Sequence, residues 1–284
     1  MAFYRQLGVI PPKRHTQHRD DNGNLYYEEL MGEEGFSSDS ALLYHKYIPS
    51  AIVEASEWTV PEQSTTPNHP LKPRHLKLHD LFPESVWNDT DVVTGRRMIL
   101  GNPDVRISYA VSKKPSPLYR NVVGDEMVYV ESGTANVETV FGTLEAKPGD
   151  YVLLPMATTH RWVPTGDEPL RAYTIEANSH IVPPKRYLSK FGQFLENAPF
   201  CERDLHGPTE PLIVEEENVE VLVKHRTSHA SSVPATSCRT TRSTSSAGTA
   251  ACTRTRSRST TTSRSPVACT SRRRRTSRSR ATTS

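Results

Sequence analysis

The sequence predicts a mainly β protein made of three unlike parts, and three observations support this prediction. Short alternating runs separated by turn residues fill the middle of the chain from about Val92. Prolines and scattered charges mark the first 90 residues, and Arg, Ser and Thr make up most of the last 58. We therefore expect an irregular arm with short strands over 1–90, a β-barrel with a flanking segment over 91–226, and a disordered tail over 227–284.

The first 90 residues lack the periodicity of a long helix. Apolar residues in SALLYHKYIPSAI stand in short clumps, which favours strands or irregular structure. The many prolines of this region also argue against long helices, because proline removes a backbone donor and clashes with the preceding turn. We expect an arm that wraps around the core.

The middle of the chain carries the strand signal. RRMILGNPDVRISYAVS contains two β-rich runs split by the turn GNPD. DEMVYVESGTANVETVFGTLEAKPGDYVLLP continues the alternation with turns at ESGT and KPGD, and HRWVP, LRAYTIEAN and PLIVEEENVEVLVKHRT add further runs. Short strands with regularly spaced turns are typical of an antiparallel barrel or sandwich.

Charge is divided sharply along the chain. The tail holds 12 of the 35 basic residues and no acidic residue, so residues 1–226 carry 23 basic against 32 acidic side chains, a net charge of −9. This balance argues against nucleic-acid or membrane-surface binding by the body. No apolar run approaches the roughly 18 residues of a membrane span, and the start lacks a secretory pattern. Cys201 is the single cysteine of the body, which fits a reduced, cytoplasmic setting.

The segment around Gly133 and Pro155 resembles the cupin signature, the mark of a small double-stranded β-barrel. Its first block is His-x-His, four residues, Glu, six residues, Gly; its second is Gly, about five residues, Pro-x-Gly, two residues, His. Gly133, Gly149 and Pro155 match, and Ala157 replaces the last glycine. The four ligand positions then fall on Tyr119, Asn121, Glu126 and His160.

Two of these four positions keep a side chain typical of a metal ligand, Glu126 and His160. A non-haem Fe(II) centre usually needs two His and one carboxylate, so the donors are too few. We expect a metal-free structural cupin in which Glu126 and His160 are vestigial, either hydrogen-bonded together or separately solvated. A metal ion held by these two residues is the alternative.

Two other histidine pairs have suggestive spacing. His15 and His18 lie among Arg and Gln in the irregular arm, and we interpret them as surface residues rather than ligands. His75 and His79 are four residues apart, which would place them on one face of a helix. No HExxH-type Glu stands between them, so we expect a solvated surface there as well.

Several longer stretches resemble the N-terminal part of the homogentisate 1,2-dioxygenase family in its bacterial form. The similarity runs from Met1 to about Arg226. It rests on these stretches: PPKRHTQ, EELMGEEGFSSDSALLYH, TGRRMILGNPDVRISY, SPLYRN, GDEMVYVESG and GQFLENAPFCERDLHGP.

This resemblance implies a bicupin that uses one Fe(II) and O2 to open the ring of homogentisate, giving maleylacetoacetate, in the cytoplasmic breakdown of tyrosine and phenylalanine. It implies trimers or hexamers, a structural first barrel, and a second barrel that holds iron with two His and one Glu. Those ligands lie beyond the region of similarity, so no catalytic residue is assigned here and the chain is expected to be inactive as written. A non-catalytic cupin scaffold or binding subunit is the alternative.

The tail has three possible interpretations: a basic arm that binds nucleic acid, a disordered linker, or a shifted reading frame. The family carries a segment near F-D-V-V-G-W-D-G-x-L-Y-P-Y after the first barrel. In a GC-rich gene, one base of forward slip turns that segment into STSSAGTA, one free position, then CTRT. The chain has these letters from Ser243 to Thr255. We therefore predict a frameshift between about Glu220 and Ser243 and no specific nucleic-acid partner.

Overall fold

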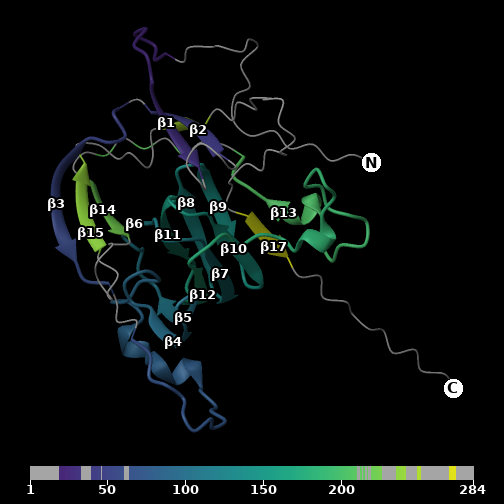
Figure 1. Ribbon diagram of the computed structural model, residues 1–284. Helices are drawn as coiled ribbons and strands as arrows, with labels where there is room; N and C mark the ends of the chain where they lie inside the picture. The colour runs from purple at the N-terminus through teal and green to yellow at the C-terminus, as the bar shows by residue number, and fades with distance from the viewer. Residues whose placement is uncertain are drawn as a thin grey trace.

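Two seven-stranded sheets form the centre of the computed structural model, and their facing sides enclose the core (Figure 1). The structure describes residues 19–32, 43–45, 47–60, 64–209, 212, 214, 216 and 219–225, and the backbone of 40–42, 235–240, 248–250 and 269–272. The fold is mainly β and of jelly-roll type, as the alternation predicts, although the two sheets do not close into one continuous ladder.

The first large sheet has the order β13-β17-β10-β7-β12-β5-β4. Its strands are β4 Arg97–Gly101, β5 Val105–Ser112, β7 Glu126–Ser132, β10 Asp150–Leu154, β12 Leu170–Ala177, β13 Leu205–His206 and β17 Cys269–Arg272. The second has the order β3-β15-β14-β6-β11-β8-β9. Its strands are β3 Ile52–Trp58, β6 Leu118–Asn121, β8 Thr134–Thr139, β9 Gly142–Ala146, β11 Thr159–Thr165, β14 Val219–Lys224 and β15 Ala235–Thr240.

Alternating apolar residues fill the space between the two sheets. Every second residue of β7, β8, β9, β10 and β12 is buried, because successive side chains of a strand point to opposite faces. The core cluster draws from both sheets, with Val128 and Val152 from one and Val137, Leu144 and the fully buried Trp162 from the other. The alternation in the sequence therefore decides which residues face the interior.

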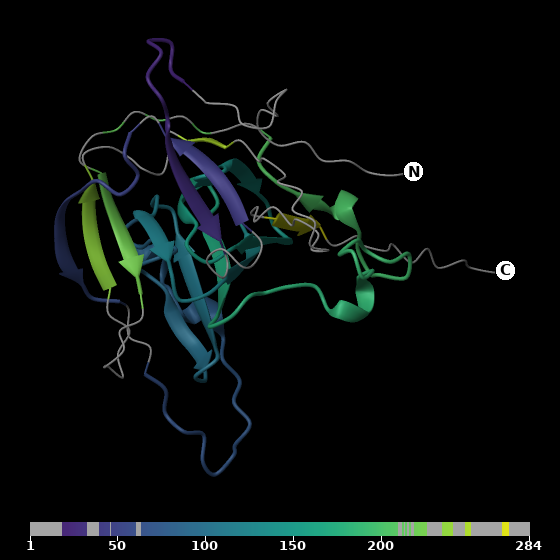
Figure 2. The same ribbon diagram turned by 45° about the horizontal axis from the view of Figure 1, so that its top comes forward.

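The arm adds elements at two edges of this core. Strands β1 Tyr27–Gly32 and β2 Ser40–His45 form a hairpin in which Met31 and Leu43 pack on Phe141. The hairpin lies at the top in Figure 1 and faces the viewer in Figure 2. Two 3₁₀ turns, η1 Leu78–Leu81 and η2 Glu84–Val86, lie against β5. Short strands and irregular segments without long helices are what the prolines predict.

Three short backbone segments of the Arg/Ser/Thr-rich region are strands: β15 pairs with β14 and β3, β17 pairs with β10 and β13, and β16 Gly248–Ala250 pairs with β2. The other residues of 227–284 lie outside the described residues. For them the expected disorder stays a prediction, as do the three-part division of the chain and the frameshift.

Two turns of the cupin signature require unusual backbone. Gly133 has φ +73°, and a Cβ there would lie 2.6 Å from the carbonyl oxygen of Pro169. Ala157 has φ +67°, the only positive φ at a non-glycine residue in the described part of the chain. The signature has glycine at this position, because a left-handed backbone strains any residue with a Cβ.

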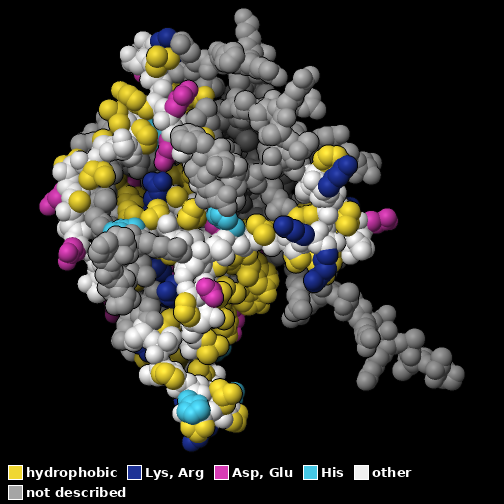
Figure 3. Space-filling view, viewed as in Figure 1, with side chains coloured by type: hydrophobic (Ala, Val, Ile, Leu, Met, Phe, Trp, Pro, Cys, Tyr) yellow, Lys and Arg dark blue, Asp and Glu magenta, His cyan; other side chains and the backbone are white. Residues whose placement is uncertain are grey.

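The outer face of the first sheet carries a row of tyrosines. In the register, Tyr151 lies opposite Tyr129, Tyr129 opposite Tyr173, and Tyr173 opposite Tyr109. Ring centroids of Tyr129 and Tyr151 lie 4.8 Å apart, as do those of Tyr109 and Tyr173. Phe82 packs on the Tyr109 end, and Figure 3 shows hydrophobic side chains at the surface near β7 and β10. Solvated faces of antiparallel sheets are usually polar, so this face is unusually apolar.

No helix in the described ranges is both long enough and apolar enough to cross a membrane.

Candidate functional site

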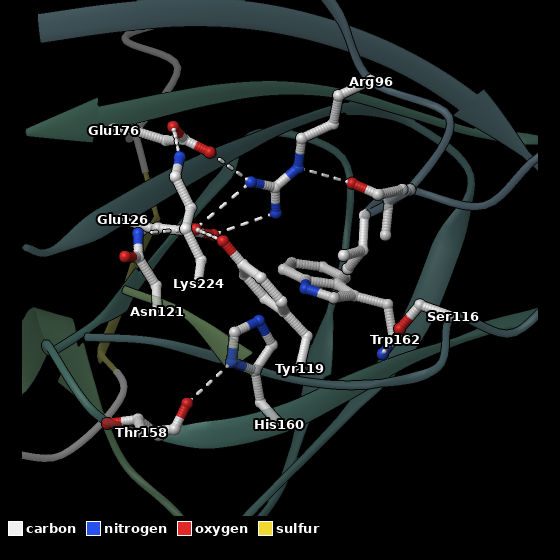
Figure 4. A network of polar contacts seen from close by, with 12 residues as sticks. Arg96, Ser116, Tyr119, Asn121, Glu126, Thr158, His160, Trp162, Glu176 and Lys224 are labelled. Atoms are coloured by element: carbon white, nitrogen blue, oxygen red, sulfur yellow. Dashed lines mark hydrogen bonds and ion pairs between the residues drawn. The ribbon is translucent and has the colours of Figure 1, made fainter. Parts of the chain in front are cut away.

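The four positions compared with cupin ligands in the sequence converge in the interior (Figure 4). Tyr119 and Asn121 lie on β6, Glu126 is the first residue of β7, and His160 lies on β11. All four are at most 5% exposed. Arg96, from the turn before β4, reaches into the middle of this group (Figure 4).

Glu126 is the centre of the group and accepts four hydrogen bonds. The Arg96 guanidinium donates two of them, from Nη1 to Oε1 at 3.2 Å and from Nη2 to Oε2 at 2.9 Å. The hydroxyl of Tyr119 donates to Oε1 at 3.0 Å, and the amide of Asn121 donates to the same oxygen at 2.9 Å. Such a bidentate arginine–carboxylate pair is among the strongest polar contacts in proteins.

A second carboxylate and a second cation complete the network. Arg96 Nη1 also donates to Glu176 Oε1 at 2.7 Å, and Lys224 Nζ donates to Glu176 Oε2 at 2.5 Å. The side chains of Arg96, Glu126, Glu176 and Lys224 are each at most 6% exposed. Two buried negative charges therefore face two buried positive charges, so the charges of these four side chains balance.

The network sets the protonation states of its members. Burial alone would raise the pKa of Glu126, but the charge and hydrogen bonds of Arg96, with smaller effects of His160 and Lys224, lower it to about 2. Burial would lower the pKa of Arg96, but Glu126 and Glu176 raise it overall. Burial and the two carboxylates hold the pKa of the Tyr119 hydroxyl well above its usual value. Glu126 is thus ionised and Tyr119 is a neutral donor at neutral pH.

His160 is buried beside this network but does not hydrogen-bond to it. Its Nδ1 lies 3.0 Å from the carbonyl oxygen of Thr158, so Nδ1 carries the proton and donates. Burial lowers the pKa of His160 more than the charge of Glu126 raises it. The ring is therefore neutral, and its Nε2 lone pair has no hydrogen-bond partner among the described residues.

One family model matches the part of the chain that carries this geometry. Residues 109–176 match the family model described as "Cupin domain". This part of the chain has the cupin fold. The matched region contains all four ligand positions, which lie on β6, β7 and β11, and it also contains Glu176 of β12.

A protein of Saccharolobus solfataricus, named "Putative dioxygenase SSO1533", is 33% identical over 226 residues. The match covers 79% of this chain and 56% of that protein, so the chain spans little more than half of its relative's length. The chain is therefore similar to a cupin dioxygenase.

Solved structures align with smaller parts of the chain. One is titled a putative mannose-6-phosphate isomerase from Ralstonia eutropha, with 25% identity, 37% of this chain and 98% of that chain covered, and a TM-score of 0.32. Another, BH2720 from Bacillus halodurans, has 22% identity, 41% and 85% coverage, and a TM-score of 0.31.

The residues of this cupin interior do not fit a metal ion as they stand. Both carboxylate oxygens of Glu126 already accept hydrogen bonds from Arg96. The hydroxyl of Tyr119 and the side-chain NH2 of Asn121 also point at Glu126 and donate to it, so they present donors where a metal would need ligands. Of the four ligand positions, only His160 has a side-chain nitrogen or oxygen without a hydrogen-bond partner among the described residues. No group of three His, Cys, Asp or Glu in the described ranges could hold a metal. A cation is nevertheless present beside Glu126: it is the guanidinium of Arg96.

The other histidines singled out in the sequence are not brought together. His15 and His18 lie outside the described residues. His75 is exposed in a segment without regular secondary structure, and His79 lies in η1, so the two do not share a helix face. His79 Nε2 lies 3.2 Å from a carboxylate oxygen of Glu131, and its ring stacks on Tyr109.

Sequence reasoning missed Arg96, Glu176 and Lys224. The sequence did indicate that Glu176 is buried, because in the strand LRAYTIEA it lies on the same face as the buried residues Ala172 and Thr174. No comparable signal marked Arg96, which stands in a turn next to a second arginine, the exposed Arg97.

Proposed function

We propose that this chain is the structural, metal-free cupin part of a ring-cleaving dioxygenase of the homogentisate type. The observation that carries the proposal is the ion pair of Arg96 with Glu126, which fills the interior where a catalytic cupin would need open metal ligands. The motifs shared with that family and the similarity to a protein named as a dioxygenase support the same assignment.

The reaction proposed for the complete protein is the opening of homogentisate by O2, with Fe(II), to give maleylacetoacetate. The iron ligands are proposed to lie in sequence that has no counterpart here, because the match covers 56% of the dioxygenase-named relative. On this proposal the chain alone binds no iron and cleaves no ring.

We propose that this chain lacks the iron ligands because the reading frame shifts between the codons of Glu220 and Ser243. The test is to sequence these codons afresh and to express the gene with the frame restored. We expect an open frame about 150 to 200 residues longer whose product holds Fe(II) through two His and one carboxylate and cleaves homogentisate. Early stops in both other frames would refute the proposed reason.

A non-catalytic scaffold subunit is the second candidate, and the tyrosine row favours it. Tyr129, Tyr151 and Tyr173 form an apolar outer face on the first sheet that another subunit could cover. We propose assembly into trimers or hexamers for the complete protein. Co-expression with a full-length copy, followed by size-exclusion chromatography, tests this: the scaffold function predicts mixed oligomers, and separate elution of the two chains contradicts it.

A further inference from the structure

Two neighbouring strands of the first sheet bring the rings of Tyr129 and Tyr151 together on its outer face. Tyr129 of β7 lies directly opposite Tyr151 of β10 in the antiparallel register, so their side chains are cross-strand neighbours. The ring centroids are 4.8 Å apart, and the ring planes are inclined by 41°. Both side chains are partly exposed, so a reagent in solution can reach this close pair of phenols.

We propose that this pair is an oxidative modification site, at which Tyr129 and Tyr151 couple to an intramolecular dityrosine in the presence of a one-electron oxidant. The new bond joins the ring carbons next to the two hydroxyl groups, and it fastens β7 covalently to β10. The inference concerns the surface of this chain and does not depend on the proposed dioxygenase function.

The geometry of the pair is close to that of the coupled product. The centres of two directly bonded rings are separated by two ring radii and one carbon–carbon bond, which is slightly less than the 4.8 Å between Tyr129 and Tyr151. Directly bonded rings also twist out of a common plane, because the groups next to the bond would otherwise clash, and these two rings are already inclined by 41°. The rings therefore need only a small movement to couple.

The other tyrosine pairs of the row have geometries that favour coupling less. Tyr109 and Tyr173 are also 4.8 Å apart, but their rings meet edge-on at 63°. Tyr109 is fully buried, and its hydroxyl donates to Glu131, which holds the ring in this orientation. The rings of Tyr129 and Tyr173 are farther apart, with centroids 6.2 Å from each other. Distance, ring orientation and exposure together therefore select the pair of Tyr129 with its β10 neighbour.

The reaction consumes two equivalents of a one-electron oxidant, such as a ruthenium(III) complex or a radical derived from a peroxide. Each tyrosine loses one electron to the oxidant and its hydroxyl proton to water, which gives two phenoxyl radicals. The unpaired electrons reside partly on the ring carbons beside the oxygen, where the new carbon–carbon bond forms. The hydrogen on each of these carbons then leaves as a proton, and each oxygen takes up a proton again. The product therefore lacks two hydrogen atoms.

The experiment oxidises the purified chain with photogenerated ruthenium(III) tris-bipyridine and persulfate, at a protein concentration low enough to keep cross-links within single chains. Digestion with trypsin and a glutamate-specific protease then places Tyr129 in residues 127–131, Tyr151 in 146–161 and Tyr173 in 172–176. We expect dityrosine fluorescence in the monomer band of a denaturing gel and a peptide that joins 127–131 to 146–161. The mass of this peptide should be two hydrogen atoms below the sum of its parts.

Phenylalanine variants are the controls, because each removes one hydroxyl group and keeps the ring. Y129F and Y151F should each lose the cross-linked peptide, whereas Y173F, the matched control from the same row, should keep it. Unfolding in urea before oxidation should lower its yield, because the strand register that brings the rings together is lost. The proposal is overturned if the folded chain forms no dityrosine, if dityrosine appears only in linked dimers, or if the main cross-linked peptide comes from another tyrosine pair.

Discussion

At the scale of residues, the interior of this cupin depends on one arginine that neutralises two carboxylates. Replacing Arg96 by Met keeps much of the volume but leaves Glu126 and Glu176 facing Lys224 alone. We expect R96M to lose about 3–5 kcal/mol of unfolding free energy, the usual cost of breaking a buried ion pair on one side. Urea denaturation followed by tryptophan fluorescence measures this loss.

The double variant R96M/E126Q is the matched control. It removes one carboxylate together with the arginine, so that Glu176 and Lys224 remain as a balanced pair. We expect the double variant to be more stable than R96M, although it carries one substitution more. If the losses of unfolding free energy caused by R96M and by E126Q simply add in the double variant, Arg96 does not act by balancing charge.

Acid should destabilise this network in two pH ranges. The pKa of Glu126 falls from 4.5 to about 2 on folding, so its contribution is complete above pH 4.5 and disappears as the pH falls toward 2. That contribution is about 3 kcal/mol. The pKa of His160 is also lowered from 6.5, so the unfolded chain takes up this proton first and stability already begins to fall below about pH 6.5.

Chemical denaturation at intervals from pH 8 to pH 3 separates the two groups. The E126Q variant should lose the decline below pH 4.5, and H160Q should lose the decline that begins near pH 6.5. An unchanged pH profile in both variants would contradict the assigned protonation states.

At the scale of elements, the turn before β11 carries a residue that its backbone does not suit. Ala157 has φ +67°, and its N–H donates to the carbonyl oxygen of Asn121 at 2.7 Å, which fixes the turn against β6. Replacing Ala157 by Gly should stabilise the protein by about 1 kcal/mol, because glycine adopts this conformation without strain.

Gly149 provides the reverse substitution as a control. It has φ +92°, and a Cβ there would meet nothing within 4 Å, so G149A tests backbone strain without a steric clash. We expect thermal unfolding to show a higher Tm for A157G and a lower one for G149A. A lower Tm for A157G would mean that the methyl group contributes more by packing on the β1–β2 hairpin than it costs in strain.

The sequence predicts elements better than it predicts the site. Alternation in β7 to β12, with turns at Gly133 and Gly149, indicates which residues face the interior. The expectation that Glu126 and His160 pair with each other or are separately solvated is wrong, because both are buried and no hydrogen bond joins them. The partners of Glu126 and Glu176 could not be foreseen, since Arg96 lies 30 residues from Glu126 and 80 from Glu176, and Lys224 lies 48 from Glu176. A charged side chain in a turn ordinarily indicates a surface position.

At the scale of the whole molecule, the same arrangement fits the proposed metal-free role of this cupin region. The two sheets need a filled, charge-balanced interior, and Arg96 with Lys224 supplies the positive charge that a metal ion would otherwise bring. The chain spans little more than half of its dioxygenase-named relative.

The central claim is that this cupin region is structural and not catalytic, and oxygen uptake tests it most directly. Purified chain, loaded with Fe(II) without oxygen and then mixed with homogentisate and O2 in an oxygen electrode, should consume O2 no faster than Fe(II) and homogentisate without protein. The E126Q and H160Q variants should give the same background rate. A homogentisate-dependent uptake well above that background, abolished by chelator and lost in E126Q, would contradict the account.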